Sequence, residues 1–76
     1  MKLTYTFESD ERELAEVVLN ILRQFDYETS RILERNGSHR FKATIYGTTR
    51  ERNEPRIRNL IEHFGITCNE VKETIE

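Results

Sequence analysis

The sequence predicts an α+β domain whose strands and helices follow one another in the order β-α-β-β-α-β. The spacing of apolar residues predicts this order, because it alternates along the chain between every second residue and every third or fourth. The dipeptide Asn36-Gly37 tolerates positive φ at both positions and predicts a hairpin turn between the two middle strands. A content of 36% apolar and 34% charged residues is typical of a compact chain. We therefore expect one domain over residues 1–76.

The first strand and the first helix have clear local signals. Residues 2–8 alternate between polar and apolar side chains, and the apolar positions are Leu3, Tyr5 and Phe7. Ser9-Asp10 then supplies N-cap chemistry, and Asp10 and Glu13 have the spacing of a capping box. The helix should end near Phe25 or Asp26. Its apolar stripe consists of Leu14, Val17, Val18, Ile21, Leu22 and Phe25.

The hairpin strands, residues 27–35 and 38–47, admit two registers. A two-residue loop places Arg35 opposite Ser38, and the ladder then pairs Ile32 with Phe41, Ser30 with Ala43 and Tyr27 with Tyr46. A three-residue loop instead pairs Leu33 with Phe41 and Arg31 with Ala43, which places Arg31 under the helices at a desolvation cost. We prefer the two-residue loop, although it turns Leu33 outward.

The second helix should begin between Arg50 and Pro55, after a cap at Thr48 or Thr49. Its buried stripe consists of Ile57, Leu60, Ile61 and Phe64, and Gly65 occupies the position of a left-handed C-cap. In the last strand, residues 67–76, the apolar side chains change parity near Asn69, which predicts a bulge or a break in register.

An antiparallel sheet of four strands in the order 4-1-3-2, with both helices on one face, resembles the ferredoxin-like α/β plait. The resemblance concerns topology alone. Residues 40–47 lack the glycine-rich aromatic pattern of RNA-recognition motifs, and no Cys-x-x-Cys precedes the first helix as it does in metallochaperones. Topology of this kind does not imply a function.

Several function classes lack a sequence signal. The most apolar stretch, residues 14–22, is interrupted by Glu16 and Asn20, so we expect no membrane association. The single Cys68 fits a reducing compartment, and we expect a cytoplasmic protein. His39, His63 and Cys68 have no partners at metal-ligand spacing, and the glycines form no phosphate loop. We therefore expect no metal, no cofactor and no enzymatic activity.

Charge is distributed unevenly along the chain, whose net charge is −2. Residues 31–58 contain eight basic and three acidic residues, whereas both flanking segments are acidic. Four of the basic residues, Arg50, Arg52, Arg56 and Arg58, lie at the entry to the second helix, where they either meet an anion or pair with Glu51 and Glu54.

The sheet face opposite the helices is the candidate interaction surface. In the preferred register it collects Lys2, Tyr27, Arg31, Arg40, Lys42 and Tyr46. Basic and aromatic side chains together suit nucleic acid, yet a solvated face also needs polar residues to stay soluble.

Three functions remain open. The first is a non-catalytic binding or protein-interaction module that uses the open sheet face and the edge strands, with a second copy or another protein as partner. The second is binding of RNA or single-stranded DNA by the basic-aromatic face, which the negative net charge disfavours. The third is a designed or redesigned plait without a selected function, which the regular patterning and caps favour and the single Cys68 disfavours.

Overall fold

The computed structural model describes residues 1–75, so Glu76, the end of the predicted last strand, lies outside the described residues. The elements are β1 (Lys2–Ser9), α1 (Arg12–Gln24), β2 (Glu28–Thr29), β3 (Leu33–Arg35), β4 (Ser38–Tyr46), α2 (Arg50–Phe64) and β5 (Thr67–Thr74). The protein therefore has an α+β fold with two helices and an antiparallel sheet of five strands.

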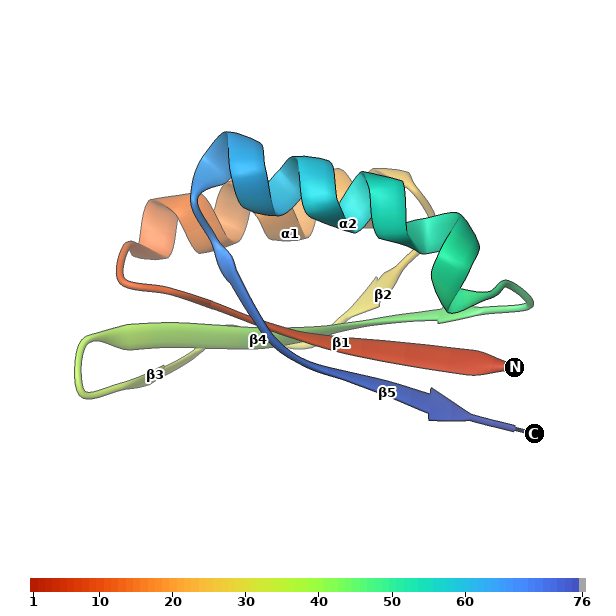
Figure 1. Cartoon of the computed structure of the whole chain (residues 1–76). Coiled ribbons are helices and arrows are strands. Elements are labelled where there is room, and N and C mark those ends of the chain that lie inside the picture. The colour runs from red at the N-terminus through yellow and green to blue at the C-terminus, as the bar shows by residue number, and fades with distance from the viewer. Residues whose placement is uncertain (76) are drawn as a thin grey trace.

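The sheet has β1 and β4 at its centre. Strand β5 pairs with the outer side of β1, whereas β2 and β3 both pair with the outer side of β4. Both helices cover the same face of this sheet, and the opposite face, which we call the open face, is uncovered (Figure 1). The predicted sheet of four strands in the order 4-1-3-2 thus differs in its strand count, because two short strands occupy the place of one.

The core lies between the helices and the covered face of the sheet. The alternation predicted for the first strand is confirmed, because Leu3, Tyr5 and Phe7 are buried. The Phe7 ring stacks on Phe41 of β4 with 5.4 Å between the ring centroids. Ala43, one position further along the same face of β4, is also buried. This contiguous apolar layer is what holds the two helices against the sheet.

The predicted second strand, residues 27–35, forms as two short strands, β2 and β3, and its predicted register is correct only near the turn. Arg35 lies opposite Ser38 across Asn36-Gly37, as the two-residue loop requires, and both turn residues have positive φ. Leu33 points outward and is 63% exposed, as this register predicts. The preferred loop is therefore confirmed.

Beyond the turn the ladder shifts by one residue. Thr29 lies opposite Ala43, so the predicted Ser30–Ala43 pair is wrong. Five residues on this side, from Thr29 to Leu33, lie opposite four on β4, from Ala43 to Arg40. The extra residue is a bulge, and it turns the side chains that precede it to the opposite face of the sheet.

The predicted stripe of α1 is correct at Val18 and Leu22 and wrong at Val17 and Phe25. The buried residues of this helix are Ala15, Val18, Leu19 and Leu22, whereas Val17 and Phe25 are exposed. Phe25 lies at the C-cap, and the Arg56 guanidinium covers its ring at 4.2 Å from the centroid. Asp26 then has a φ of 69°, and Tyr27, which follows it, is buried in the core.

The start of α1 also differs from the prediction. Strand β1 continues to Ser9, which pairs with His39, so the helix begins only at Arg12. The N-cap is Glu11, and its side chain makes no capping hydrogen bond. The Ser9 hydroxyl instead accepts a hydrogen bond from the Glu11 backbone N–H at 3.1 Å. The predicted capping box of Asp10 is therefore wrong.

Helix α2 has the predicted boundaries. It begins at Arg50, and the Thr49 side chain caps it by accepting a hydrogen bond from the Arg52 backbone N–H at 3.3 Å. Gly65 ends it in the left-handed conformation with a φ of 67°. The early start places Pro55 in the second turn, where it removes one backbone donor from the helix.

The predicted break in the last strand is confirmed. Thr6 pairs with Glu70 and Phe7 pairs with Cys68, so Asn69 is the extra residue of a bulge. As a result, Cys68 and Val71 both face the helices, although their numbers differ in parity.

Candidate functional site

Four of the six predicted surface residues lie on the open face. Lys2, Arg40, Lys42 and Tyr46 occupy the outward positions of β1 and β4, which alternate with the buried residues of the core. Lys2 lies opposite Tyr46, and its ammonium nitrogen is 5.9 Å from the centre of the tyrosine ring. Between these ends, the Thr4 and Thr44 hydroxyls form a hydrogen bond at 3.2 Å.

A fifth predicted residue lies beside Arg40 and Lys42. Arg31 lines a shallow hollow of about 340 Å³ together with Leu33, Arg40 and Lys42, and Ser30 and Phe41 complete its wall. We call these six residues the basic hollow. The Lys42 backbone N–H donates to the Ser30 hydroxyl at 2.8 Å and fixes the edge of the hollow. Three cations thus surround one exposed leucine.

One cation of the basic hollow is already paired. The Arg40 guanidinium donates to Glu8 at 2.8 Å, and the Asn69 amide donates to the same carboxylate at 2.6 Å. The Ser38 hydroxyl, Arg40 and Asn69 lie against Glu8 and lower the pKa of its carboxyl to about 2. Glu8 therefore stays ionised and neutralises part of the positive charge of this face.

Tyr27 does not belong to the open face, so this part of the prediction is wrong. It is 3% exposed and lies in the core, because the bulge places it opposite the covered side of β4. Its hydroxyl donates to the Asn53 side-chain oxygen, and Asn53 in turn donates to the Thr49 carbonyl at 2.7 Å. Burial raises the pKa of Tyr27, although Arg56 opposes the shift. Tyr27 anchors the first turn of α2 to the sheet.

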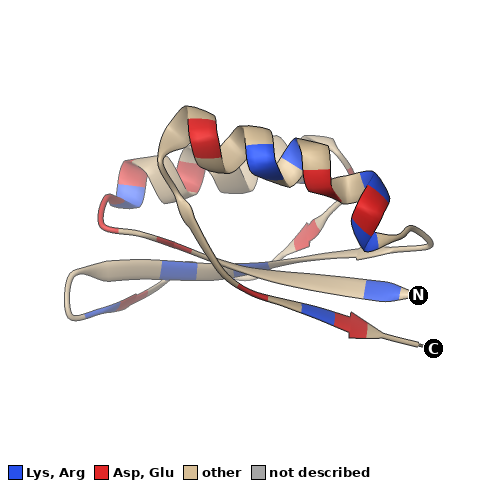
Figure 2. Cartoon of the chain, viewed as in Figure 1, with Lys and Arg blue, Asp and Glu red and all other residues tan. Residues whose placement is uncertain are grey.

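The edge strand β5 is the longest unpaired edge of the sheet. Among the described strands it pairs with β1 alone, so one side of its backbone offers hydrogen-bond donors and acceptors. Glu70 and Lys72 flank Val71 and lie on the open face, opposite Thr6 and Thr4. Figure 2 shows acidic and basic positions next to each other along β5.

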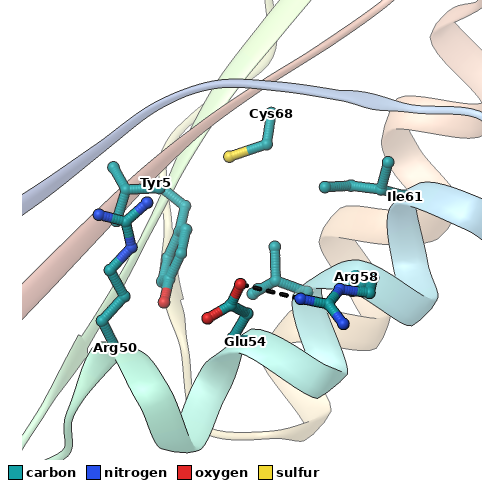
Figure 3. A pocket seen from close by; sticks show the side chains of 8 residues that line it. Tyr5, Arg50, Glu54, Arg58, Ile61 and Cys68 are labelled. Atoms are coloured by element: carbon teal, nitrogen blue, oxygen red, sulfur yellow. Dashed lines mark hydrogen bonds and ion pairs between the residues drawn. The ribbon is translucent and has the colours of Figure 1, made fainter.

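A cavity that the sequence did not reveal lies between α2 and β5. Its volume is about 250 Å³, and its lining combines apolar, charged and phenolic groups: Tyr5, Arg50, Glu54, Ile57, Arg58, Ile61, Cys68 and Val71. The Cys68 side chain points from β5 into the space between Tyr5 and Ile61 (Figure 3). The one sequence signal was the tyrosine at position 5, since a buried Tyr needs a hydrogen-bond partner that Phe does not.

The two histidines line neither the basic hollow nor the cavity between α2 and β5. His39 is buried beside the hairpin, with its Nδ1 3.6 Å from the Glu34 carboxylate. His63 is exposed near the end of α2, and its ring packs edge-on against Phe64. Residues 1–75 contain no group of three or more His, Cys, Asp or Glu side chains placed to hold a metal ion.

Neither α1 nor α2 is long and apolar enough to cross a membrane.

Comparison with models of protein families finds none that matches the chain, and comparison with curated proteins finds no significant similarity.

Proposed function

We propose that this chain is a non-catalytic interaction module, built as an interrupted variant of the ferredoxin-like α/β plait, that pairs through β5 with a second copy of itself. The observation that carries the proposal is the edge of β5, which is eight residues long and pairs on one side only among the described strands. Edge strands of this length are templates for a further strand. The single, free Cys68 supports a cytoplasmic location.

Charge complementarity selects the second copy as partner. Two β5 strands related by a two-fold axis run antiparallel, and an axis at Val71 places Glu70 of each copy opposite Lys72 of the other. Both side chains lie on the open face, so each contact is a cross-strand pair of opposite charge. Each such pair contributes roughly 0.2–1 kcal/mol, in addition to the backbone ladder.

Charge variants test the pairing. Lys72→Glu replaces the two attractions by two repulsions, and a change of about 1–3 kcal/mol raises the dimer Kd roughly five- to a hundredfold. The double variant Glu70→Lys with Lys72→Glu is the matched control, because exchanging the two charges restores opposite pairs across the axis. Sedimentation equilibrium from micromolar to millimolar concentration measures all three proteins.

Dimers of the wild type and of the double variant, with a monomeric single variant, support the proposal. A monomeric wild type at millimolar concentration, or equal Kd values for all three proteins, contradicts it.

A second candidate is the binding of single-stranded nucleic acid by the basic hollow. Its support is the proximity of Arg31, Arg40 and Lys42. Two observations weaken it: Tyr27 is buried and offers no ring for stacking, and Glu8 neutralises Arg40. An amide chemical-shift titration with mixed single-stranded RNA tests it, because binding requires shifts at the basic hollow that weaken with salt.

The irregular features of the chain count against an idealised design. Two bulges interrupt the sheet, and Asp26 has a positive φ. Thermal unfolding separates the alternatives, since idealised designs are typically hyperstable whereas ordinary domains melt at about 45–65 °C.

A further inference from the structure

The cavity between α2 and β5 contains a polar group that lacks a partner. Tyr5 is 2% exposed, and its buried hydroxyl has no hydrogen-bond partner among residues 1–75. Leaving a buried hydroxyl unpaired is unfavourable, and more than nine in ten buried polar groups in proteins avoid it. A phenylalanine would fill the same position in the core without this penalty, so the hydroxyl points to a ligand that completes its hydrogen bonding.

A positive charge lies next to this hydroxyl. Arg50, the first residue of α2, lies beside Tyr5 at one side of the cavity (Figure 3). Its charge acts on Tyr5 more strongly than that of Glu73 on β5, and it also acts on the Cys68 thiol. Among the described residues Arg50 forms no ion pair, so its guanidinium is available to a ligand.

The other charges of the cavity neutralise each other. Arg58 donates to Glu54 at 3.0 Å, across one turn of α2, and this pair lies on the helix side of the cavity (Figure 3). The remaining lining is apolar and comes from Ile57, Ile61 and Val71, with the Cys68 thiol between them. The lining therefore favours an anion with an apolar body.

The thiol environment does not favour covalent chemistry. Burial raises the pKa of Cys68, so the reactive thiolate is disfavoured at neutral pH. The Cys68 sulfur also lies 3.7 Å from the Glu70 carbonyl, to which its proton points. The ligand is thus held by non-covalent contacts.

We propose that the cavity between α2 and β5 binds a small carboxylic acid with an apolar body, whose carboxylate receives hydrogen bonds from the Tyr5 hydroxyl and the Arg50 guanidinium. A phenol and a guanidinium are both donors, and a carboxylate is an acceptor for both. The cavity volume of about 250 Å³ accommodates a small organic acid such as one with about ten non-hydrogen atoms.

This site is separate from the proposed dimer contact. The cavity lies on the helix side of β5, whereas the dimer contact uses the free backbone edge and the open-face charges Glu70 and Lys72. Ligand binding can therefore be tested in a monomer as well as in a dimer.

Phenylacetate is a suitable probe, because it combines a carboxylate with a small apolar ring. Phenylacetamide, which has the same shape without the charge, and acetate, which lacks the ring, are the controls. A methyl and amide chemical-shift titration of the labelled full chain should show saturable shifts at Ile57, Ile61, Cys68 and Val71. Hydrogen bonds to a charged group predict about a tenfold to hundredfold weaker affinity for phenylacetamide.

Variants separate recognition from folding. Arg50→Gln and Tyr5→Phe should each weaken phenylacetate binding about tenfold or more. Arg52→Gln makes the same change of charge two residues further along α2, outside the cavity, and should leave the affinity unchanged. Neither change at Tyr5 or Arg50 removes a contact on which folding depends, since one group is unpaired and the other makes no ion pair among the described residues.

Three results overturn the proposal: no saturable shift at the cavity, equal affinity for phenylacetate and phenylacetamide, or an equal loss in Arg50→Gln and Arg52→Gln. A monomeric wild type would contradict the dimer alone, so the two proposals fail independently.

Discussion

The substitution Tyr→Phe should change the free energy of unfolding in opposite directions at Tyr5 and at Tyr27. The Tyr5 hydroxyl is buried without a partner, whereas the Tyr27 hydroxyl donates to Asn53. An unpaired buried polar group costs about 1–3 kcal/mol, so removing the Tyr5 hydroxyl should raise the free energy of unfolding by about 1 kcal/mol. Removing the Tyr27 hydroxyl leaves the Asn53 oxygen without its donor. This change should lower the free energy of unfolding by about 1–2 kcal/mol.

Thermal and urea unfolding at neutral pH, followed by circular dichroism, measure both variants. For a domain of this size, 1 kcal/mol corresponds to a change in Tm of about 4–8 °C. The urea m value should stay constant, because neither change alters the surface exposed on unfolding. A loss of stability in Tyr5→Phe would refute the reasoning, since it would mean that the hydroxyl is already satisfied.

The Tyr5→Phe variant should also change the pH dependence of stability. Burial, followed by the neighbouring Tyr27, raises the pKa of Tyr5 to about 12, above its ordinary value of 10.0. Because the hydroxyl ionises more readily in the unfolded chain, the free energy of unfolding should fall as the pH rises from 10.0 through about 12. Tyr5→Phe should remove this part of the loss of stability at alkaline pH. A variant that loses stability between pH 10.0 and about 12 as steeply as the wild type would contradict this expectation.

Three further substitutions test the fold. Phe41→Ala removes a buried ring that stacks on Phe7 and should cost about 3–5 kcal/mol in urea unfolding, whereas a cost near zero would exclude the described register. Glu8→Gln should flatten the loss of stability between pH 4.5 and about 2, because the folded pKa of Glu8 lies below its ordinary value and its contribution disappears on acidification. Gly65→Ala should cost about 1–2 kcal/mol through its φ of 67° alone, because no atom lies within 4 Å of the added methyl; thermal unfolding equal to wild type would contradict this.

The parts of the fold that the sequence predicts are those with local causes. The Asn36-Gly37 turn and the Gly65 cap follow from the positive φ that each position requires. The bulge at Asn69 was visible as a change of parity, since Cys68 and Val71 are apolar residues an odd number of positions apart.

The parts that the sequence missed depend on contacts between distant segments. The bulge between Thr29 and Leu33 has no local marker, yet its single extra residue moves Tyr27 from the open face into the core. The predicted stripe of α1 included Phe25, which is exposed, whereas Tyr27, two residues later, is buried. The spacing of apolar residues cannot reveal a one-residue bulge when the residues on both sides of it are typical of a strand.

The candidate sites divide in the same way. The residues of the open face were predictable where polar and apolar side chains alternate along β1 and β4. This holds for Lys2, Arg40, Lys42 and Tyr46. The cavity was not predictable, because it forms where α2 passes over β5 and joins Tyr5, Arg50 and Cys68 from three separate elements.

The most direct test of the central proposal is an isotope-filtered NOE experiment on an equal mixture of ¹³C-labelled and unlabelled protein. Pairing of β5 about a two-fold axis at Val71 predicts NOEs between the Val71 methyls of a labelled and an unlabelled copy, and these NOEs should disappear in Lys72→Glu. A mixed sample without any intermolecular NOE at β5, at a concentration in the millimolar range, would contradict the account.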